Sequence, residues 1–193
     1  IAGDANLDGL VTTGDAVAAV GFALERTVPS EKAFEAADIN KSGKITVSDV
    51  VGIINIALDE ELDARTMADN ANNFLTMDGA EVSLMNSTTF VGFQMDVTLA
   101  QGAVLNGVEL AQRAAGLTVA YNRVADNTYR IVAFSTDKAV IQGSEGALFS
   151  LNIAGNSNVT VSNVEFTDAA ARAYALEMAA TTGINSGVAG AAA

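Results

Sequence analysis

The sequence contains no cysteine, no histidine and no tryptophan, and its only proline is Pro29. Without cysteine there are no disulfides or thiolate nucleophiles, and without histidine there are no zinc sites of the usual kind and no histidine-based catalytic triads. No uninterrupted apolar run reaches the roughly eighteen residues of a membrane-spanning helix. These absences exclude a large part of enzyme chemistry and a membrane span.

Basic residues are scarce as well. Ten Lys and Arg stand against 23 Asp and Glu, which gives a formal net charge of −13. This charge repels nucleic-acid phosphates and anionic membranes and favours cations or basic surfaces. We therefore expect no nucleic-acid partner. Hydrophobic residues make up 50% of the 193 residues and charged residues 17%, a balance typical of one or two folded domains rather than of a disordered chain.

The first third of the chain contains a twelve-residue loop twice, at Asp4–Asp15 and at Asp38–Asp49, an offset of 34 residues. Both copies have oxygen-bearing side chains at positions 1, 3, 5, 9 and 12, and glycine at position 6 (Gly9 and Gly43). Glycine at position 6 permits the left-handed turn that lets oxygen ligands converge on one ion. A single such loop could be a solvated turn, whereas two copies predict EF-hand-type calcium sites.

A helical pattern of apolar residues follows each loop at the same offset. The spacing places these side chains on one face of a helix that begins near the aspartate at position 12, where negative charge suits both a metal and a helix N-terminus. Before the second loop, only residues 30–37 could form a short helical turn. We expect one small core, formed once calcium relieves the carboxylate repulsion, from Val17, Val20, Leu24, Val51, Ile54 and Leu58.

Duplicated loop–helix units of this length, with Asp rather than Glu at position 12, resemble the type I dockerin module of bacterial polysaccharide-degrading assemblies. The resemblance covers about residues 3–60 and implies two Ca²⁺ ions. The ligands that it implies in the first loop are Asp4, Asn6, Asp8, the Leu10 carbonyl, Thr12 and Asp15. Those that it implies in the second loop are Asp38, Asn40, Ser42, the Lys44 carbonyl, Thr46 and Asp49. The two threonines would bind directly or through water.

The same resemblance implies a partner-binding surface at loop positions 10 and 11. These positions are occupied by Thr13 and Gly14 in the first repeat and by Val47 and Ser48 in the second. The two loops also differ in charge, because the first has three carboxylates whereas the second has two, with Lys41 and Lys44 inside the loop. Since carboxylate count helps to set calcium affinity, we expect the second site to be weaker.

Beyond residue 73 the apolar residues alternate with polar ones. The run Val91–Leu99 alternates as a strand with one buried face should. Residues 117–134 read as a hairpin, and a phase shift at residues 162–163 indicates a bulge. Many short strands punctuated by glycine predict an antiparallel β-sandwich over residues 74–176. The order of these strands resembles the cohesin-like sandwich, whose members bind dockerins.

The predicted fold class is α + β with two domains, a small all-α calcium-binding domain over residues 1–62 and the antiparallel β-sandwich over residues 74–176. Residues 63–73, which are polar and end in an Asn-rich stretch, predict a linker. Residues 177–193, which are small and polar, predict a flexible tail. The two halves could also pack on each other, within one chain or between chains.

The two resemblances imply a non-catalytic, calcium-dependent scaffold protein located outside the cell or on the bacterial surface, with cohesin-like or dockerin-like domains as partners. The alternative is a carbohydrate-binding sandwich carried by a calcium-stabilised domain, with a polysaccharide as ligand. Tyr121 and Tyr129, which flank one hairpin, could stack on a sugar or form a structural cross-strand pair, and the second interpretation is favoured. Carboxylates are numerous enough for a glycosidase, but no spacing selects a catalytic pair.

Overall fold

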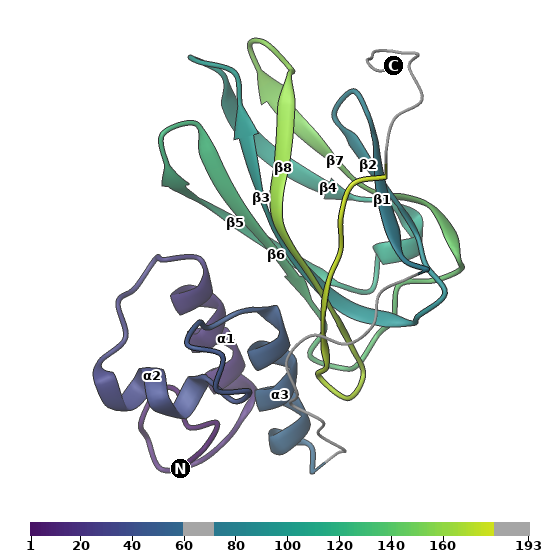
Figure 1. Ribbon diagram of the computed structural model, residues 1–193. Helices are drawn as coiled ribbons and strands as arrows, with labels where there is room; N and C mark the ends of the chain where they lie inside the picture. Colours follow the sequence, from purple (N-terminus) through teal and green to yellow (C-terminus); the bar gives the residue numbers. More distant parts are fainter. Residues whose placement is uncertain (60–71, 180–193) are drawn as a thin grey trace.

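The computed structural model describes residues 1–59 and 72–179, and these form a small helical unit beside a β-sandwich (Figure 1). The helical unit, residues 1–59, contains α1 (Thr13–Ala23), α2 (Glu31–Ala37) and α3 (Val47–Ala57). The predicted α + β fold class is confirmed. Most of the predicted linker and tail lies outside the described residues, so the domain boundaries stay a prediction. Within the described residues no helix has the length and hydropathy needed to cross a membrane.

The sandwich has two antiparallel sheets, one of order β1-β2-β7-β4 and one of order β5-β6-β3-β8-β9. Its strands are β1 (Phe74–Asp78), β2 (Glu81–Met85), β3 (Phe90–Leu99), β4 (Val104–Leu110), β5 (Thr118–Ala125), β6 (Thr128–Phe134), β7 (Glu145–Ala154), β8 (Val159–Asp168) and β9 (Ala173–Ala175). A short 3₁₀ helix, Gln112–Ala114, precedes β5. The last described residues run beside β1, where the Leu75 N–H donates to the Glu177 carbonyl at 3.2 Å.

The helices α1 and α3 begin at the ends of the two loops because each loop supplies the N-cap of the helix that follows it. The carboxylate of Asp15 accepts a hydrogen bond from the backbone N–H of Thr12 at 2.8 Å, and that of Asp49 accepts one from Thr46 at 2.9 Å. Each aspartate therefore satisfies an N–H at the start of its helix, as in a capping box. Ser30 caps the short α2 by accepting from the Ala33 N–H at 3.2 Å.

Several strand features that the sequence predicts are present. The hairpin β5–β6 turns at Asp126 and Asn127, and Asn127 takes the left-handed conformation with φ 58°. The bulge predicted at residues 162–163 lies in β8, where Asn163 has φ 51° and the pairing with β3 shifts register between Gln94 and Asp96. The expectation of one buried face for β3 is wrong, because Gln94 and Asp96 on its second face are also buried.

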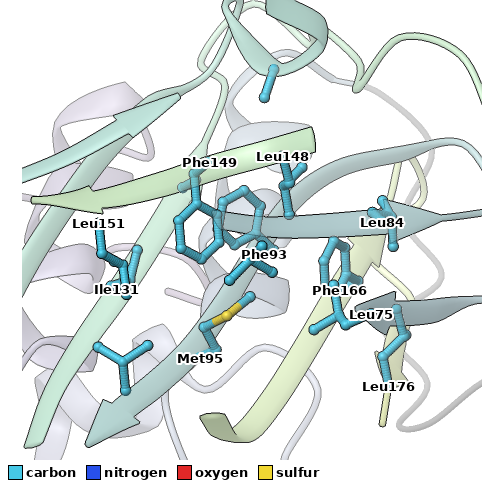
Figure 2. Close-up of a cluster of buried hydrophobic side chains, with 14 of the residues drawn as sticks. Leu75, Leu84, Phe93, Met95, Ile131, Leu148, Phe149, Leu151, Phe166 and Leu176 are labelled. Atoms are coloured by element: carbon cyan, nitrogen blue, oxygen red, sulfur yellow. The ribbon is translucent and has the colours of Figure 1, made fainter. Parts of the chain in front are cut away.

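The main core lies between the two sheets and is rich in phenylalanine. The ring of Phe93 on β3 stacks on Phe149 of β7 and on Phe166 of β8, each with ring centroids 5.4 Å apart (Figure 2). Tyr121 and Tyr129 form the expected cross-strand pair, with ring centroids 6.4 Å apart, and both pack with this core. These two rings therefore serve the sandwich interior rather than an exposed platform for a sugar.

Candidate calcium loops and domain interface

The two loops have the same hydrogen-bonded conformation. The carboxylate at position 1 accepts from the backbone N–H groups of positions 5 and 6, at 3.0 and 3.0 Å for Asp4 and at 3.0 and 2.9 Å for Asp38. The carboxylate at position 12 accepts from those of positions 3 and 9, at 3.0 and 2.8 Å for Asp15 and at 3.2 and 2.9 Å for Asp49. Each loop thus folds back around its first and last carboxylates.

The turn of each loop depends on two left-handed residues. Position 6 has φ 95° in Gly9 and φ 84° in Gly43, and nothing lies within 4 Å of where a Cβ would stand on either. Position 4 is also left-handed, with φ 63° in Leu7 and φ 57° in Lys41. Lys41 does not point into its loop, because its ammonium donates to the Glu35 carbonyl at 3.0 Å.

Four carboxylates are held away from solvent at the ends of the loops. Asp15 and Asp49 are fully buried, and Asp4 and Asp38 are exposed by only 5% and 6%. Burial raises the pKa of Asp49 to about 7, against the opposing effect of the hydrogen bonds from the backbone of Thr46 and Asn40. A buried carboxylate is costly in its charged form, and a divalent cation beside it would remove that cost. The donor set therefore fits a hard cation with oxygen ligands.

The other implied ligands are exposed or half-buried in their loops. Asn6 and Asp8 in the first loop and Ser42 in the second are exposed, and the Ser42 hydroxyl donates to the Lys44 carbonyl at 3.0 Å. No group of three or more acidic, histidine or cysteine side chains gathers at one point anywhere in residues 1–59 and 72–179. An ion in either loop would thus depend on amide, hydroxyl and carbonyl oxygens in addition to carboxylates.

The four residues implied in partner binding have two different environments. Thr13 and Gly14 are exposed, whereas Val47 and Ser48 are buried, at 0% and 2% exposure, against the sandwich of the same chain. The Val47 N–H donates to Oε1 of Gln94 on β3 at 3.0 Å. Oε2 of Glu165 on β8 accepts from the Ser48 hydroxyl at 2.9 Å and also from the Thr46 hydroxyl. The surface implied for the second repeat is therefore covered within the chain.

The sheet also contacts the C-terminal end of α1. The Arg130 guanidinium on β6 donates through Nη1 to the Ala23 carbonyl and to Glu25, both at 3.0 Å, while its Nε donates to Asp96 at 2.8 Å. The Asn122 amide donates to the Leu24 carbonyl at 2.8 Å. Glu165 at the N-terminal end of α3 and Arg130 at the C-terminal end of α1 thus oppose the partial charges of those helix ends.

Apolar contacts fill the space between these two polar ends. Val132 and Phe134 of β6 belong to the hydrophobic cluster of the helical unit, and Val51 of α3 packs against Val91 and Ala171. In sequence terms, Gln94, Asp96 and Glu165 look like solvent-facing residues of alternating strands. Gln94 and Asp96 are buried and Glu165 is half-buried because the helical unit covers this face of the sheet, and β3 therefore has two covered faces.

Gly92 permits the close approach of β3 to α3. A Cβ at this position would lie 3.0 Å from Val47 Cγ2 and 2.9 Å from the Ala133 carbonyl oxygen. We predict that Gly92→Ala loosens the docking of the helical unit, at a cost of about 1–3 kcal/mol for overpacking. The measurement is hydrogen exchange along α3, including the Val47 N–H that donates to Gln94. The control is Gly107→Ala on β4, because Gly107 lacks a positive φ and the nearest atom to an added Cβ is 3.9 Å away. Equal protection at α3 in wild type and Gly92→Ala would contradict it.

Residues 2–57 match the family model of the dockerin type I domain. The matched segment ends with α3, so it contains both loops and all three helices. No curated protein matches the chain. The matched segment thus coincides with the part of the chain in which the loop–helix pattern repeats.

Among solved structures, the sandwich is similar to cohesins at low identity. A non-cellulosomal cohesin from the archaeon Archaeoglobus fulgidus has a TM-score of 0.44 at 11% identity, over 56% of this chain and 86% of that one. A cohesin module of a family 33 glycoside hydrolase from Clostridium perfringens has a TM-score of 0.43 at 14% identity, over 57% and 92%. A type I cohesin–dockerin complex from Clostridium thermocellum has a TM-score of 0.44 at 10% identity, over 57% and 94%.

The core expected for the helical unit is wrong at two positions. Val17 and Leu58 are exposed by 59% and 43%. Val51 is buried, but its neighbours are in the sandwich rather than in the other repeat. The expectation of one buried face also fails for α3, because every residue from Val47 to Asn55 is buried between the first repeat and the sandwich.

Proposed function

We propose that this chain is a non-catalytic, calcium-dependent protein–protein interaction protein of extracellular polysaccharide-degrading assemblies. The observation that carries the proposal is the shared conformation of two loops around four buried carboxylates. The dockerin type I match over residues 2–57 supports the same reading, because modules of this family bind calcium and recognise other proteins.

Two Ca²⁺ ions would occupy the loops. The first would be held by Asp4, Asn6, Asp8, the Leu10 carbonyl, Thr12 and Asp15, and the second by Asp38, Asn40, Ser42, the Lys44 carbonyl, Thr46 and Asp49. The ions supply positive charge next to carboxylates that the fold buries. Residues 1–62 contain eleven acidic against four basic side chains. Neutralising part of this charge favours the compact helical unit.

The helical unit docks on the sandwich of its own chain through the second repeat and through the C-terminal end of α1. Thr46 and Asp49 are implied ligands, while Thr46, Val47 and Ser48 contact Gln94 and Glu165. Calcium binding and docking therefore share one short segment. A sandwich of another chain that presents the same polar groups would compete for this segment.

The test is hydrogen exchange of the whole chain in calcium and in chelator. We expect protection of α1, α3 and β8 in calcium and its loss from α1 and α3 in chelator, because metal binding and folding are coupled in such loops. Unchanged protection of both helices in chelator would exclude calcium dependence. Rapid exchange of the Val47 N–H in calcium would exclude the docked state, because this amide donates to Gln94 of the sandwich.

We also predict that the two calcium sites differ in affinity. The first loop has three carboxylates and the second has two, so the second should bind more weakly by on the order of tenfold. Calorimetric titration of Asp15→Asn should lack the tighter step, and that of Asp49→Asn the weaker one. If Asp49→Asn instead loses the tighter step, the second loop is the stronger calcium site and the prediction is wrong.

A further inference from the structure

The two halves of the helical unit have nearly the same backbone at the ends of their helices. The N-caps have φ −137°, ψ 176° in Thr12 and φ −132°, ψ −179° in Thr46. Beyond the C-caps, Glu25 and Asp59 are both left-handed, with φ 57° and 55°. A unit turned so that the repeats exchange places would thus present very similar helix ends to the sheet.

Several docking contacts would survive such an exchange. The N–H that Val47 donates to Gln94 has a counterpart in the N–H of Thr13. The Thr46 hydroxyl that contacts Glu165 has a counterpart in Thr12. The carbonyls of Ala23 and Leu24, which accept from Arg130 and Asn122, correspond to backbone carbonyls at the end of α3. The backbone and the shared threonine therefore do not distinguish the two orientations.

Three side-chain hydrogen bonds would be lost. One is exposed: the Arg26 guanidinium donates to the Tyr121 carbonyl at 2.8 Å, and the residue at the same place in the second repeat is Glu60, which has no donor. The other two come from α3. The Ser48 hydroxyl donates to Oε2 of Glu165 at 2.9 Å, and its counterpart Gly14 has no hydroxyl. The Asn55 amide donates to the Ala169 carbonyl at 2.9 Å, and its counterpart Gly21 has no side chain. In addition, the fully buried Val47 would be replaced by Thr13, whose hydroxyl would then be buried.

We propose that the sandwich binds the helical unit in one orientation only, and that Ser48 and Asn55 are the residues of α3 that select it. The inference rests on the proposed function, because it specifies how that interaction surface is used. A hydrogen bond to a carboxylate and one to a carbonyl together favour the observed orientation by more than about tenfold. The first repeat, with Thr13, Gly14 and Val17, stays on the open side of the unit.

The orientation can be measured with pairs of spin labels, since the chain has no cysteine of its own. Leu7 and Lys41 occupy the same position in the two loops and are both exposed. Leu7 lines one groove together with Thr118 of β5, whereas Gly43 in the second loop lines another groove with Asn163. Labels at Leu7→Cys and Thr118→Cys should give one short distance, and labels at Lys41→Cys and Thr118→Cys one long distance.

Three outcomes of this measurement in calcium are informative. One distance for each pair supports the proposal. If each labelled pair shows both the short and the long distance, the helical unit docks in two orientations. This result would contradict the proposal of a single orientation but would leave the docked interaction, and hence the proposed function, intact. A broad distribution in both pairs would show that the units do not dock, which would contradict the interaction itself.

Variants then test whether Ser48 and Asn55 make the selection. Ser48→Ala with Asn55→Ala should add the second distance to each labelled pair. Adding Gly14→Ser and Gly21→Asn should make the exchanged orientation dominant. Both glycines lack positive φ, and the nearest atoms to an added Cβ are hydroxyls of Thr12 and Thr27 at 3.2 and 3.1 Å. If the fourfold variant fails to fold by circular dichroism, the Ser48→Ala, Asn55→Ala pair alone decides: an unchanged single distance would reject the role of these residues.

Discussion

Replacing Asp15 and Asp49 together with asparagine is expected to unfold the helical unit and to release it from the sandwich. Both side chains are fully buried, cap their helices and accept backbone hydrogen bonds within their loops. A ligand at about one hundred times its Kd stabilises a folded state by about 2.7 kcal/mol, so two calcium sites together contribute about 5 kcal/mol under such conditions. A duplicated unit of this size has little other core with which to replace that amount.

The measurement is far-ultraviolet circular dichroism and thermal unfolding in millimolar calcium, with the same scans in excess chelator. The double variant in calcium should match the wild type in chelator, and both should lose the helical signal while the sandwich transition remains. Asp126→Asn is the matched control, because the Asp126 side chain is fully exposed at the β5–β6 turn. If the wild type has the same helical signal in calcium and in chelator, the folding of the helical unit does not depend on the metal.

The second large effect is expected from a pair of substitutions at repeat-related positions. Val51 is exposed by 1% and packs against Val91 and Ala171 of the sandwich, whereas Val17, its counterpart, is exposed by 59%. Val51→Asp places a charge in this apolar contact and should cost about 3 kcal/mol or more of docking free energy. Val17→Asp should leave docking unchanged, because its side chain already faces solvent.

Small-angle scattering and hydrogen exchange in calcium can compare the two variants. We expect a larger radius of gyration and faster exchange of the Val47 N–H, which donates to Gln94, in Val51→Asp only. Because both substitutions add the same charge to the same type of helix, their comparison separates docking from any general effect on helix stability. Equal behaviour of the two variants would mean that the sandwich does not distinguish α1 from α3.

The sequence predicted the parts of this molecule that depend on local patterns. Position 6 of each loop needs a left-handed residue, position 12 needs a carboxylate that also caps a helix, and both requirements are visible in Gly43 and Asp49. The hairpin turn at Asn127 and the bulge at Asn163 were likewise predictable, since alternation and turn residues are local signals. These features use contacts between residues that are near each other in the chain.

The domain interface could not be predicted in the same way. Glu165 and Gln94 alternate with apolar residues as solvent-facing side chains do, and their partners are more than forty residues away in sequence. Val17 and Val51 occupy equivalent places in the repeat, yet only Val51 is covered. The difference arises because the sandwich covers α3 along its length, whereas it contacts the first repeat only near the C-terminal end of α1. Within the repeat, the residues of α3 that differ from their counterparts at this contact are Val47, Ser48 and Asn55.

The double burial of β3 has a consequence for the behaviour of the protein at high concentration. When the helical unit leaves its sheet, the apolar side chains of Val91, Val132 and Phe134 become accessible at the same moment as Val47 and Val51. A chain in this open state thus exposes two complementary apolar surfaces, one on the sheet and one on the helical unit. Two opened chains can cover both surfaces by domain swapping, in which the helical unit of each chain docks on the sandwich of the other. Dissociation of the helical unit from its own sandwich therefore favours domain-swapped dimers over open monomers.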